Sequence, residues 1–555
     1  MKTTLTISNS GALSRLIKPT CSAALLPVLL LLLASQPSQA ASATWRPSPA
    51  TGDWNTATNW TPVTVPNGPS DTATFATSSQ TSVSLSADTE VNSVTYSPGA
   101  SAFTTTVGDG VMLTVSGFGL VNHAGAGRIQ NFVGGGAGLG SYINFINNAN
   151  VGNKGPINFT LNFNDFIIFQ NSSNAGTGVF TLNGPVEIDF YDSSTSGSGT
   201  FILNGTEGYA PVVQFFGSSN AGGGSFTLNG NGQGAYCFFN ESSTASGPFT
   251  INGAENSTNG PGFLIINSAA NNATLVANAG LDGGSGGVIS FSGDSTGGTT
   301  PTRVEVFGNG TGDLTNGNLD ISGHTAPGLA IGSIEGGGAV FLGANNLTVG
   351  SNDLSTAFSG KIQGSGGSLT KTGTGQLTLS TTSTYTGGTT VSEGTLLVTN
   401  RGGSATGTGT VTINAGTLAG TGRISGGVTI GTATSAAILA PGNGARPRTL
   451  TILSALTFNA LATYKIDLNS NNVTIDQVVA KGVTINSSAL VSIDDLGGSV
   501  LPSGTAFTVI SNTAATQIAG TFSNLADGST LTVDSNTYQV SYEGGDGNDL
   551  TLTVQ

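Results

Sequence analysis

The chain has 555 residues, of which 37% are apolar and 8% are charged, and its formal net charge is −14. The apolar share is large enough for a buried core, and its combination with so few charges argues against disorder, which pairs low hydrophobicity with high charge. The acidic balance argues against nucleic acid or an anionic membrane surface as a partner.

The first 40 residues have the pattern of a Sec-type signal peptide. Basic residues up to Lys18 precede an apolar run over residues 23–34, and a small-x-small cleavage site ends at Ala40. The run is shorter than the about 20 apolar residues that a membrane-spanning helix needs, and no second run follows. We therefore predict that residues 1–40 are removed and that the mature chain has no transmembrane segment. It is then secreted or held at a bacterial cell surface.

Residues 41–99 hold all three tryptophans, Trp45, Trp54 and Trp60. An aromatic cluster of this kind suits a compact N-terminal β cap over the open edge of a first coil. The alternative is a carbohydrate-binding platform, because sugars pack on exposed aromatic rings. In that case Trp54 and Trp60 are the candidate glycan contacts.

An internal repeat of 21–25 residues occupies residues 155–255. Each unit contains a short strand, an Asn-Gly turn, a second strand and a polar turn with a Ser-Ser pair. Such a unit is either an antiparallel hairpin or one coil of a β-solenoid. The repeated positions keep their register while the loop lengths vary, which favours stacked coils. This predicts an interior ladder of Phe159, Phe180, Phe201, Phe226 and Phe249, and a turn ladder of Asn162, Asn183, Asn204, Asn229 and Asn252.

The segment GGSLTKTGTGQLTLSTTSTYTGGTTVSEGTLLV, residues 366–398, resembles the autotransporter-associated β-strand repeat. Residues 345–362 are similar to the usual lead-in, so the repeat region extends over 345–398. The positions of the family pattern are occupied by Leu369, Lys371, Gly373, Gly375, Leu377, Leu379, Tyr385, Thr386, Gly387, Thr389, Gly394 and Leu396. The resemblance implies a β-helical passenger that is exported to the cell surface, at the outer membrane, and acts in adhesion or as a structural stalk. We expect no strands of a C-terminal translocator barrel after residue 400.

The repeat pattern predicts an all-β fold, with a parallel β-helix or β-solenoid over residues 100–455. Residues 456–555 lose the repeat and contain longer alternating strands, which predicts a C-terminal β-domain or cap. Within it, GGDGNDLTL at residues 544–552 is similar to one nonapeptide of calcium-binding RTX proteins. Because that chemistry needs adjacent copies, a Gly-Asn turn between the last two strands is the favoured interpretation and Ca²⁺ is the alternative.

Few residues suit catalysis. The mature chain has two histidines, His123 and His324, which we expect to be exposed turn residues, and one cysteine, Cys237, which we expect to be a small buried hydrophobe. Asp494 and Asp495 are the single adjacent acid pair of the mature chain, outside the regular repeats. We therefore predict no catalytic, cofactor-binding or metal-ligating residues.

The sequence thus predicts a secreted, non-enzymatic surface or extracellular structural protein or adhesin. Rows of Thr, Ser and Asn on stacked coils would bind glycans or surface proteins at repeated weak sites, and nucleic acid is not expected as a partner. One alternative is a carbohydrate-active β-helix, a lyase or hydrolase whose scattered acids meet in space, although Asp189 and Asp192 are separated by bulky Phe190 and Tyr191. Another is a carbohydrate-binding module centred on the N-terminal tryptophans.

Overall fold

The computed structural model describes residues 42–555 except 126, 136–137, 153, 242, 310–313, 433 and 443–446. The predicted signal peptide, residues 1–40, lies outside the described residues. Ala40–Gln555 form one compact unit. Its described secondary structure consists of β-strands and one 3-10 helix, η1 (Ala57–Asn59), so the predicted all-β class is confirmed.

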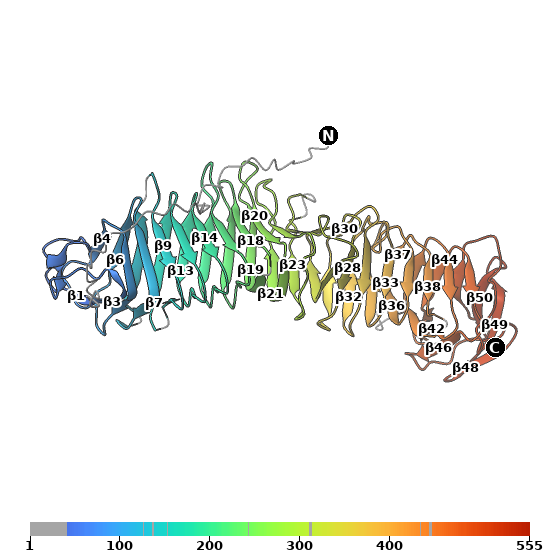
Figure 1. Cartoon of the computed structure of the whole chain (residues 1–555). Coiled ribbons are helices and arrows are strands. Elements are labelled where there is room, and N and C mark those ends of the chain that lie inside the picture. Colours follow the sequence, from blue (N-terminus) through green and yellow to red (C-terminus); the bar gives the residue numbers. More distant parts are fainter. Residues whose placement is uncertain are drawn as a thin grey trace, which may run out of the picture. The chain divides into compact units, whose positions relative to one another are not determined.

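Nearly every strand pairs in parallel with the equivalent strand of the preceding and following coils. Phe159 is the register partner of Phe180, and Phe180 is in turn the partner of Phe201. Within the repeat, strands that follow each other in the chain belong alternately to two different sheets, which excludes antiparallel hairpins for the repeat. About 17 coils succeed one another in chain order (Figure 1). The predicted parallel β-solenoid is therefore confirmed.

Two long sheets run through the coils. The first sheet contains, in pairing order, β2 (Trp60–Thr61), β1 (Ala43–Trp45), β3 (Gly68–Phe75), β5 (Thr89–Tyr96), β7 (Met112–Asn122), β9 (Tyr142–Phe145), β12 (Phe166–Phe169), β14 (Glu187–Phe190), β16 (Val212–Phe215), β18 (Ala235–Phe239), β20 (Gly262–Ile266), β22 (Val288–Phe291), β24 (Asn318–Asp320), β27 (Ala339–Phe341) and β30 (Lys361–Gln363), with β10 (Asn150–Val151) beside β7. The second sheet contains β4 (Ser82–Leu85), β6 (Thr104–Gly108), β8 (Gln130–Gly135), β11 (Ile157–Asn162), β13 (Val179–Asn183), β15 (Thr200–Asn204), β17 (Ser225–Gly230), β19 (Thr244–Ala254), β21 (Ala269–Ala277), β23 (Arg303–Val306), β26 (Ser333–Gly336), β29 (Thr356–Phe358), β32 (Gln376–Leu379), β34 (Thr395–Val398), β36 (Gly416–Gly420), β39 (Ala437–Pro441), β42 (Ala462–Asn469) and β46 (Leu490–Asp495), with β43 (Thr474–Ile475) antiparallel to β42.

Two shorter sheets complete the later coils. The third sheet contains β25 (Gly328–Ile331), β28 (Asn346–Val349), β31 (Ser368–Lys371), β33 (Thr389–Val391), β35 (Val411–Ile413), β38 (Val428–Ile430), β41 (Leu456–Phe458) and β45 (Val483–Ile485). The fourth sheet contains β37 (Arg423–Ile424), β40 (Thr449–Ile452), β44 (Gln477–Ala480), β47 (Ala506–Asn512), β50 (Asp549–Val554), β49 (Asn536–Gly544) and β48 (Thr530–Val533). Its last pairings, from β47 onward, are antiparallel.

Two ladders of phenylalanine rings fill the interior between residues 132 and 249. Strand alternation sends every second side chain inward, and the predicted ladder from Phe159 to Phe249 is confirmed, with neighbouring ring centroids 4.6–4.7 Å apart. A second ladder was not predicted. Its rings stack at 4.4–4.8 Å and meet those of the first edge to face, and they belong to Phe145, Phe169, Phe190, Phe215 and Phe239.

The predicted asparagine ladder is also confirmed and is longer than expected. Each half-buried amide donates from Nδ2 to the Oδ1 of the asparagine one coil earlier, over 2.7–3.1 Å. The donors are Asn183, Asn204, Asn229, Asn252 and Asn278. Each asparagine between the two ends of the row both donates and accepts, so one continuous series of side-chain hydrogen bonds connects successive coils at this corner.

Both ends of the described chain are continuous with the coils. β3 pairs in parallel with β5 and β5 with β7, so the tryptophan-rich region contributes strands to the first sheet. The boundaries expected near residues 99 and 455 stay predictions. Among the described residues, no helix has the length and apolarity that crossing a membrane requires.

Candidate functional site

The three tryptophans lie in the interior of the first coil. Trp45, Trp54 and Trp60 have no exposed surface, and their rings pack around Phe75 at centroid distances of 5.5–5.8 Å. The indole Nε1 of Trp60 donates to the carbonyl of Trp54 over 2.7 Å, and that of Trp54 donates to the carbonyl of Pro66 over 3.2 Å. The structure therefore does not bring Trp54 and Trp60 to the surface, where a sugar ring could stack on them.

Aromatic residues instead gather on the outer face of the first sheet, which we call the aromatic face. Half-buried rings of Tyr142 and Phe166 stack at 5.2 Å, and those of Tyr236 and Phe263 stack at 5.0 Å. Phe238 lies beside Tyr236 on the same strand. In this part of the sheet both faces of a strand carry apolar residues, although outward positions of a solvated sheet are usually polar.

Two acids lie between the ring pairs. The register places Glu187 next to Phe166 on one coil and next to Val212 on the other, and Asp189 is two residues further along β14. The pKa of Asp189 is raised to about 7, mainly by burial and also by the charge of Glu187 and a hydrogen bond with it, while a hydrogen bond from Tyr191 lowers that pKa. Gln214 Nε2 donates to Glu187 Oε1. Near neutral pH the carboxyl group of Asp189 is therefore protonated for part of the time.

A groove continues from the aromatic face over the next coils. It consists of two adjoining hollows of about 410 and 460 Å³ that share Asp320 and Phe341. The first is lined by Phe263, Val288 and Leu314, among others. The second is lined by Ser322, Gln363, Thr384 and Thr386, among others. The groove therefore has an apolar section and a section rich in hydroxyl and amide groups.

The segment 369–398 forms one coil of the solenoid and the start of the next. Its leucines alternate inward, and Leu369, Leu377 and Leu396 are buried. Lys371 ends β31 and is also buried. Its Nζ donates to the carbonyls of Thr372 at 2.6 Å and Gly373 at 2.7 Å, and to that of Glu393 on the next coil at 3.3 Å. Burial lowers the pKa of this amine, while the charges of Glu393 and Asp353 raise it.

Glycines are required at the corner beside Lys371. Gly373 has φ of +68°, and a Cβ there would lie 2.0 Å from the carbonyl oxygen of Gly350 one coil earlier. Gly394 has φ of +71°, and its Cβ would lie 2.4 Å from the carbonyl oxygen of Gly373. The repeated glycines of the motif therefore allow backbones of successive coils to approach closely.

The tyrosine of the motif connects this coil to the groove. Tyr385 is fully buried, and its hydroxyl is 2.5 Å from Thr389 Oγ1. Its neighbours Thr384 and Thr386 are exposed and line the groove. The buried ring of Tyr385 thus anchors the segment that presents the side chains of Thr384 and Thr386 to the groove.

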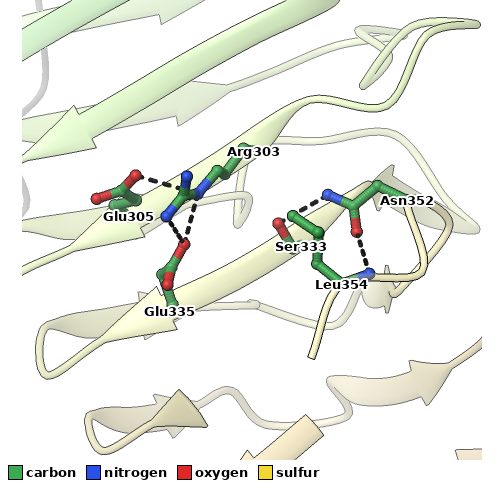
Figure 2. A network of polar contacts seen from close by, with 6 residues as sticks. All are labelled: Arg303, Glu305, Ser333, Glu335, Asn352 and Leu354. Carbon is green, nitrogen blue, oxygen red and sulfur yellow. Dashed lines mark hydrogen bonds and ion pairs between the residues drawn. The ribbon is translucent and has the colours of Figure 1, made fainter. Parts of the chain in front are cut away.

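A polar network joins two earlier coils on the second sheet (Figure 2). Arg303 lies between Glu305, at 3.1 Å, and Glu335 of the next coil, at 2.5 Å, and these partners raise its pKa. Nearby, Asn352 Nδ2 donates to Ser333 Oγ over 2.9 Å. The ion pairs are half-exposed, so they stabilise the coil contact by at most about 1 kcal/mol.

The two histidines and the cysteine of the mature chain are not arranged for catalysis. His123 is exposed, as predicted, but His324 is not: it is half-buried, and its ring nitrogens lie 2.6 Å from the carbonyls of Ser295 and Thr325. Cys237 is buried, as predicted, and burial raises the pKa of its thiol. An uncharged thiol without solvent access is a poor nucleophile.

The acids of the C-terminal region also have structural partners. Asp494 lies 3.5 Å from Lys465 Nζ in an exposed pair, and Asp495 accepts hydrogen bonds from the backbones of Ser470 and Gly497. Residues 544–552 form the turn and the adjoining strand of the antiparallel hairpin β49–β50, which confirms the predicted turn. Among the described residues, no group of three His, Cys, Asp or Glu side chains is placed to hold a metal ion.

The aromatic face and the groove were missed in the sequence. Their signal was present in strands such as FIIF (166–169), YCFF (236–239) and FLII (263–266), which are apolar at every position instead of alternating. In an exposed solenoid coil, such runs indicate an outer surface with apolar character.

In the comparison with protein families, residues 369–398 match the passenger-associated-transport-repeat. No curated protein matches the chain. The matched segment is the coil whose lysine, glycines and tyrosine are described above. The chain is therefore a parallel β-solenoid that contains a passenger-associated-transport-repeat at residues 369–398, a repeat found in autotransporter passengers.

Proposed function

We propose that the mature chain acts outside the cell or at the bacterial surface as a non-enzymatic structural stalk or adhesin. The observation that carries this proposal is the continuous series of parallel strand pairings between successive coils from β3 to β46. Among the described residues, no insertion in this series is large enough to be a separate catalytic domain. A solenoid of this kind holds side chains at fixed spacing along its axis, which suits repeated weak contacts.

Cell fractionation tests the location. The full chain, expressed with residues 1–40, is expected in the medium or accessible to protease on intact cells, whereas a variant lacking residues 1–40 is expected inside. Recovery of the full chain with the cytoplasmic fraction would contradict the proposal. Adhesion is tested separately, by attachment of beads coated with the purified mature chain to cells and to immobilised glycans.

A carbohydrate-active enzyme is the second candidate, and the Glu187–Asp189 pair favours it. A carboxyl group with a pKa of about 7 beside a second carboxyl group is an arrangement that glycosidases use for proton transfer. Product analysis after incubation with neutral and acidic polysaccharides distinguishes the candidates. Oligosaccharide release that is lost in Glu187→Gln and Asp189→Asn would establish the enzyme, and the non-enzymatic proposal would fail.

A further inference from the structure

The groove on the outer face of the first sheet has a defined chemistry. Aromatic and aliphatic groups of Phe263, Val288 and Phe341 form its apolar part, and hydroxyl and amide groups of Gln363, Thr384 and Thr386 form the remainder. The one carboxylate among these lining residues, Asp320, accepts the backbone N–H of Ser322 over 2.8 Å. A ligand must therefore offer apolar patches and many neutral hydrogen-bonding groups.

The groove crosses strands instead of following an open sheet edge. β22, β24 and β27 each pair with a neighbour on both sides, so their backbone groups are already used. A peptide could not add a strand here and would have side-chain contacts alone. The groove is therefore a poor site for a peptide bound by main-chain hydrogen bonds.

Charge excludes a second class of polymer. The chain has a formal net charge of −14, and Asp320 places a negative charge inside the groove. A polyanion such as an acidic polysaccharide or nucleic acid would be repelled. Among extended polymers, an uncharged polysaccharide combines apolar C–H faces with a regular series of hydroxyl groups, and both halves of the lining complement it.

We propose that the groove between Phe263 and Thr386 binds an extended, uncharged polysaccharide. The ring of Phe263 stacks on Tyr236, so the groove opens directly from the aromatic face, and the polymer would continue along it. The passenger-associated-transport-repeat supplies the far end of the site through Thr384 and Thr386, which Tyr385 fixes from the interior. This inference rests on the proposed extracellular location, where such polymers occur.

Affinity electrophoresis of the purified mature chain tests the site. The gels contain soluble β-glucan, xylan or galactomannan, and parallel gels contain polygalacturonate as the polyanion. We expect retardation by at least one neutral polymer, about tenfold weaker binding for Phe341→Ala and Phe263→Ala, and a smaller loss for Thr384→Val, which removes a hydroxyl group at nearly constant shape. Phe216→Ala is the matched control, because Phe216 is a half-buried ring that stacks on Tyr191 away from the groove.

Circular dichroism and thermal unfolding of each variant separate loss of binding from loss of folding. Retardation that survives in both groove variants, retardation by polygalacturonate alone, or no retardation by any neutral polymer would overturn the inference. Attachment of beads coated with the same variants distinguishes failure of the groove inference from failure of the proposed function. If wild type and Phe341→Ala attach equally well, the groove inference fails while adhesion stands; if neither is exported or attaches, the proposed function itself fails.

Discussion

Residues 155–255 and residues 369–398 build the same kind of coil with different side chains. In the first region two phenylalanine ladders fill the interior and asparagines connect one corner. In the second, leucines and valines fill the interior, and a buried lysine and glycines form the corner. The comparison teaches that parallel stacking does not depend on one residue type. It depends on the same type of side chain recurring at the equivalent position of successive coils, so that like side chains pack on one another.

The two corners differ in how they satisfy backbone and side-chain polar groups. The asparagine corner can be extended indefinitely, because each amide presents a donor to one coil and an acceptor to the other. The lysine corner is finite, since Lys371 serves three carbonyls on two coils and no equivalent lysine follows on β33. The asparagine corner therefore connects many successive coils, whereas the lysine corner connects two coils only.

The largest effect is expected from Phe201→Ala. Phe201 contacts rings on both neighbouring coils at 4.7 and 4.6 Å and is fully buried. Its loss should lower the local free energy of unfolding by about 3–5 kcal/mol, the range for removal of a core phenylalanine. Hydrogen exchange should show the loss in β13, β15 and β17, because solenoid coils contact mainly their neighbours.

The matched control is Phe216→Ala, in which a half-buried outward ring is removed. Its effect on exchange should be much smaller. If Phe201→Ala also caused an equal loss of protection from hydrogen exchange in β31 and β34, far along the chain, the two regions would unfold as one unit. The two kinds of coil would then not be independent in stability.

Lys371→Met is expected to have the next largest effect. Methionine keeps the length of the apolar stem but leaves the carbonyls of Thr372, Gly373 and Glu393 without their donor. Unpaired buried acceptors cost about 2–3 kcal/mol of unfolding free energy. Urea denaturation measures this loss of unfolding free energy, and hydrogen exchange in β31 and β33 shows where it occurs. Lys465→Met is the control, because its ion pair with Asp494 is exposed and worth little. A Lys371→Met effect as small as the control's would mean that the hydrogen bonds of Lys371 do not stabilise the contact between the two coils.

Much of the fold could be predicted because it repeats. Phe159 and Phe180 are 21 residues apart with the same neighbours, so register and ladder followed from periodicity. The second ladder was missed because Phe190 and Phe215 stand in segments whose other residues vary. His324 was wrongly placed on the surface because its two carbonyl partners belong partly to another coil, at Ser295.

The candidate site could be predicted much less well. Trp54 and Trp60 attracted attention as aromatic residues near one another, but the sequence does not say whether a cluster faces in or out, and Phe75 supplies the packing that buries them. Phe263 and Phe341 are 78 positions apart. They line one groove because β20, β22, β24 and β27 are successive neighbours in the first sheet. The coils between them vary in length, so no fixed period in the sequence predicts this proximity.

A smaller effect, with the opposite sign, is expected from Asp189→Asn in the first region. Unfolded Asp189 has a pKa of about 3.9, whereas the folded pKa is about 7, so between these values the folded state binds the proton and the unfolded state does not. This carboxyl therefore makes the protein less stable as pH rises from about 4 to about 7.

Asparagine cannot ionise, so the variant should be more stable than wild type at pH 8 by about 2 kcal/mol and similar at pH 4; the value is less than the full linkage because the outer face is partly solvated. Urea denaturation at both pH values measures the difference. Glu207→Gln, at an exposed acid in a corner loop, is the control. A difference in stability that does not change with pH would mean that the pKa of Asp189 is not raised in the folded protein.

The smallest effect is expected from Asn204→Ala, which tests whether the asparagine ladder or the phenylalanine ladder holds the first region together. Asn204 donates to Asn183 and accepts from Asn229, but the amides are half-buried and water can replace part of both bonds. The loss should be about 1 kcal/mol. Asn204→Asp should cost more, because the carboxylate keeps the bond from Asn229 while facing the Oδ1 of Asn183 without a proton to donate. If alanine were as harmful here as at Phe201, the corner amides would hold the coils and the rings would merely fill the space between them.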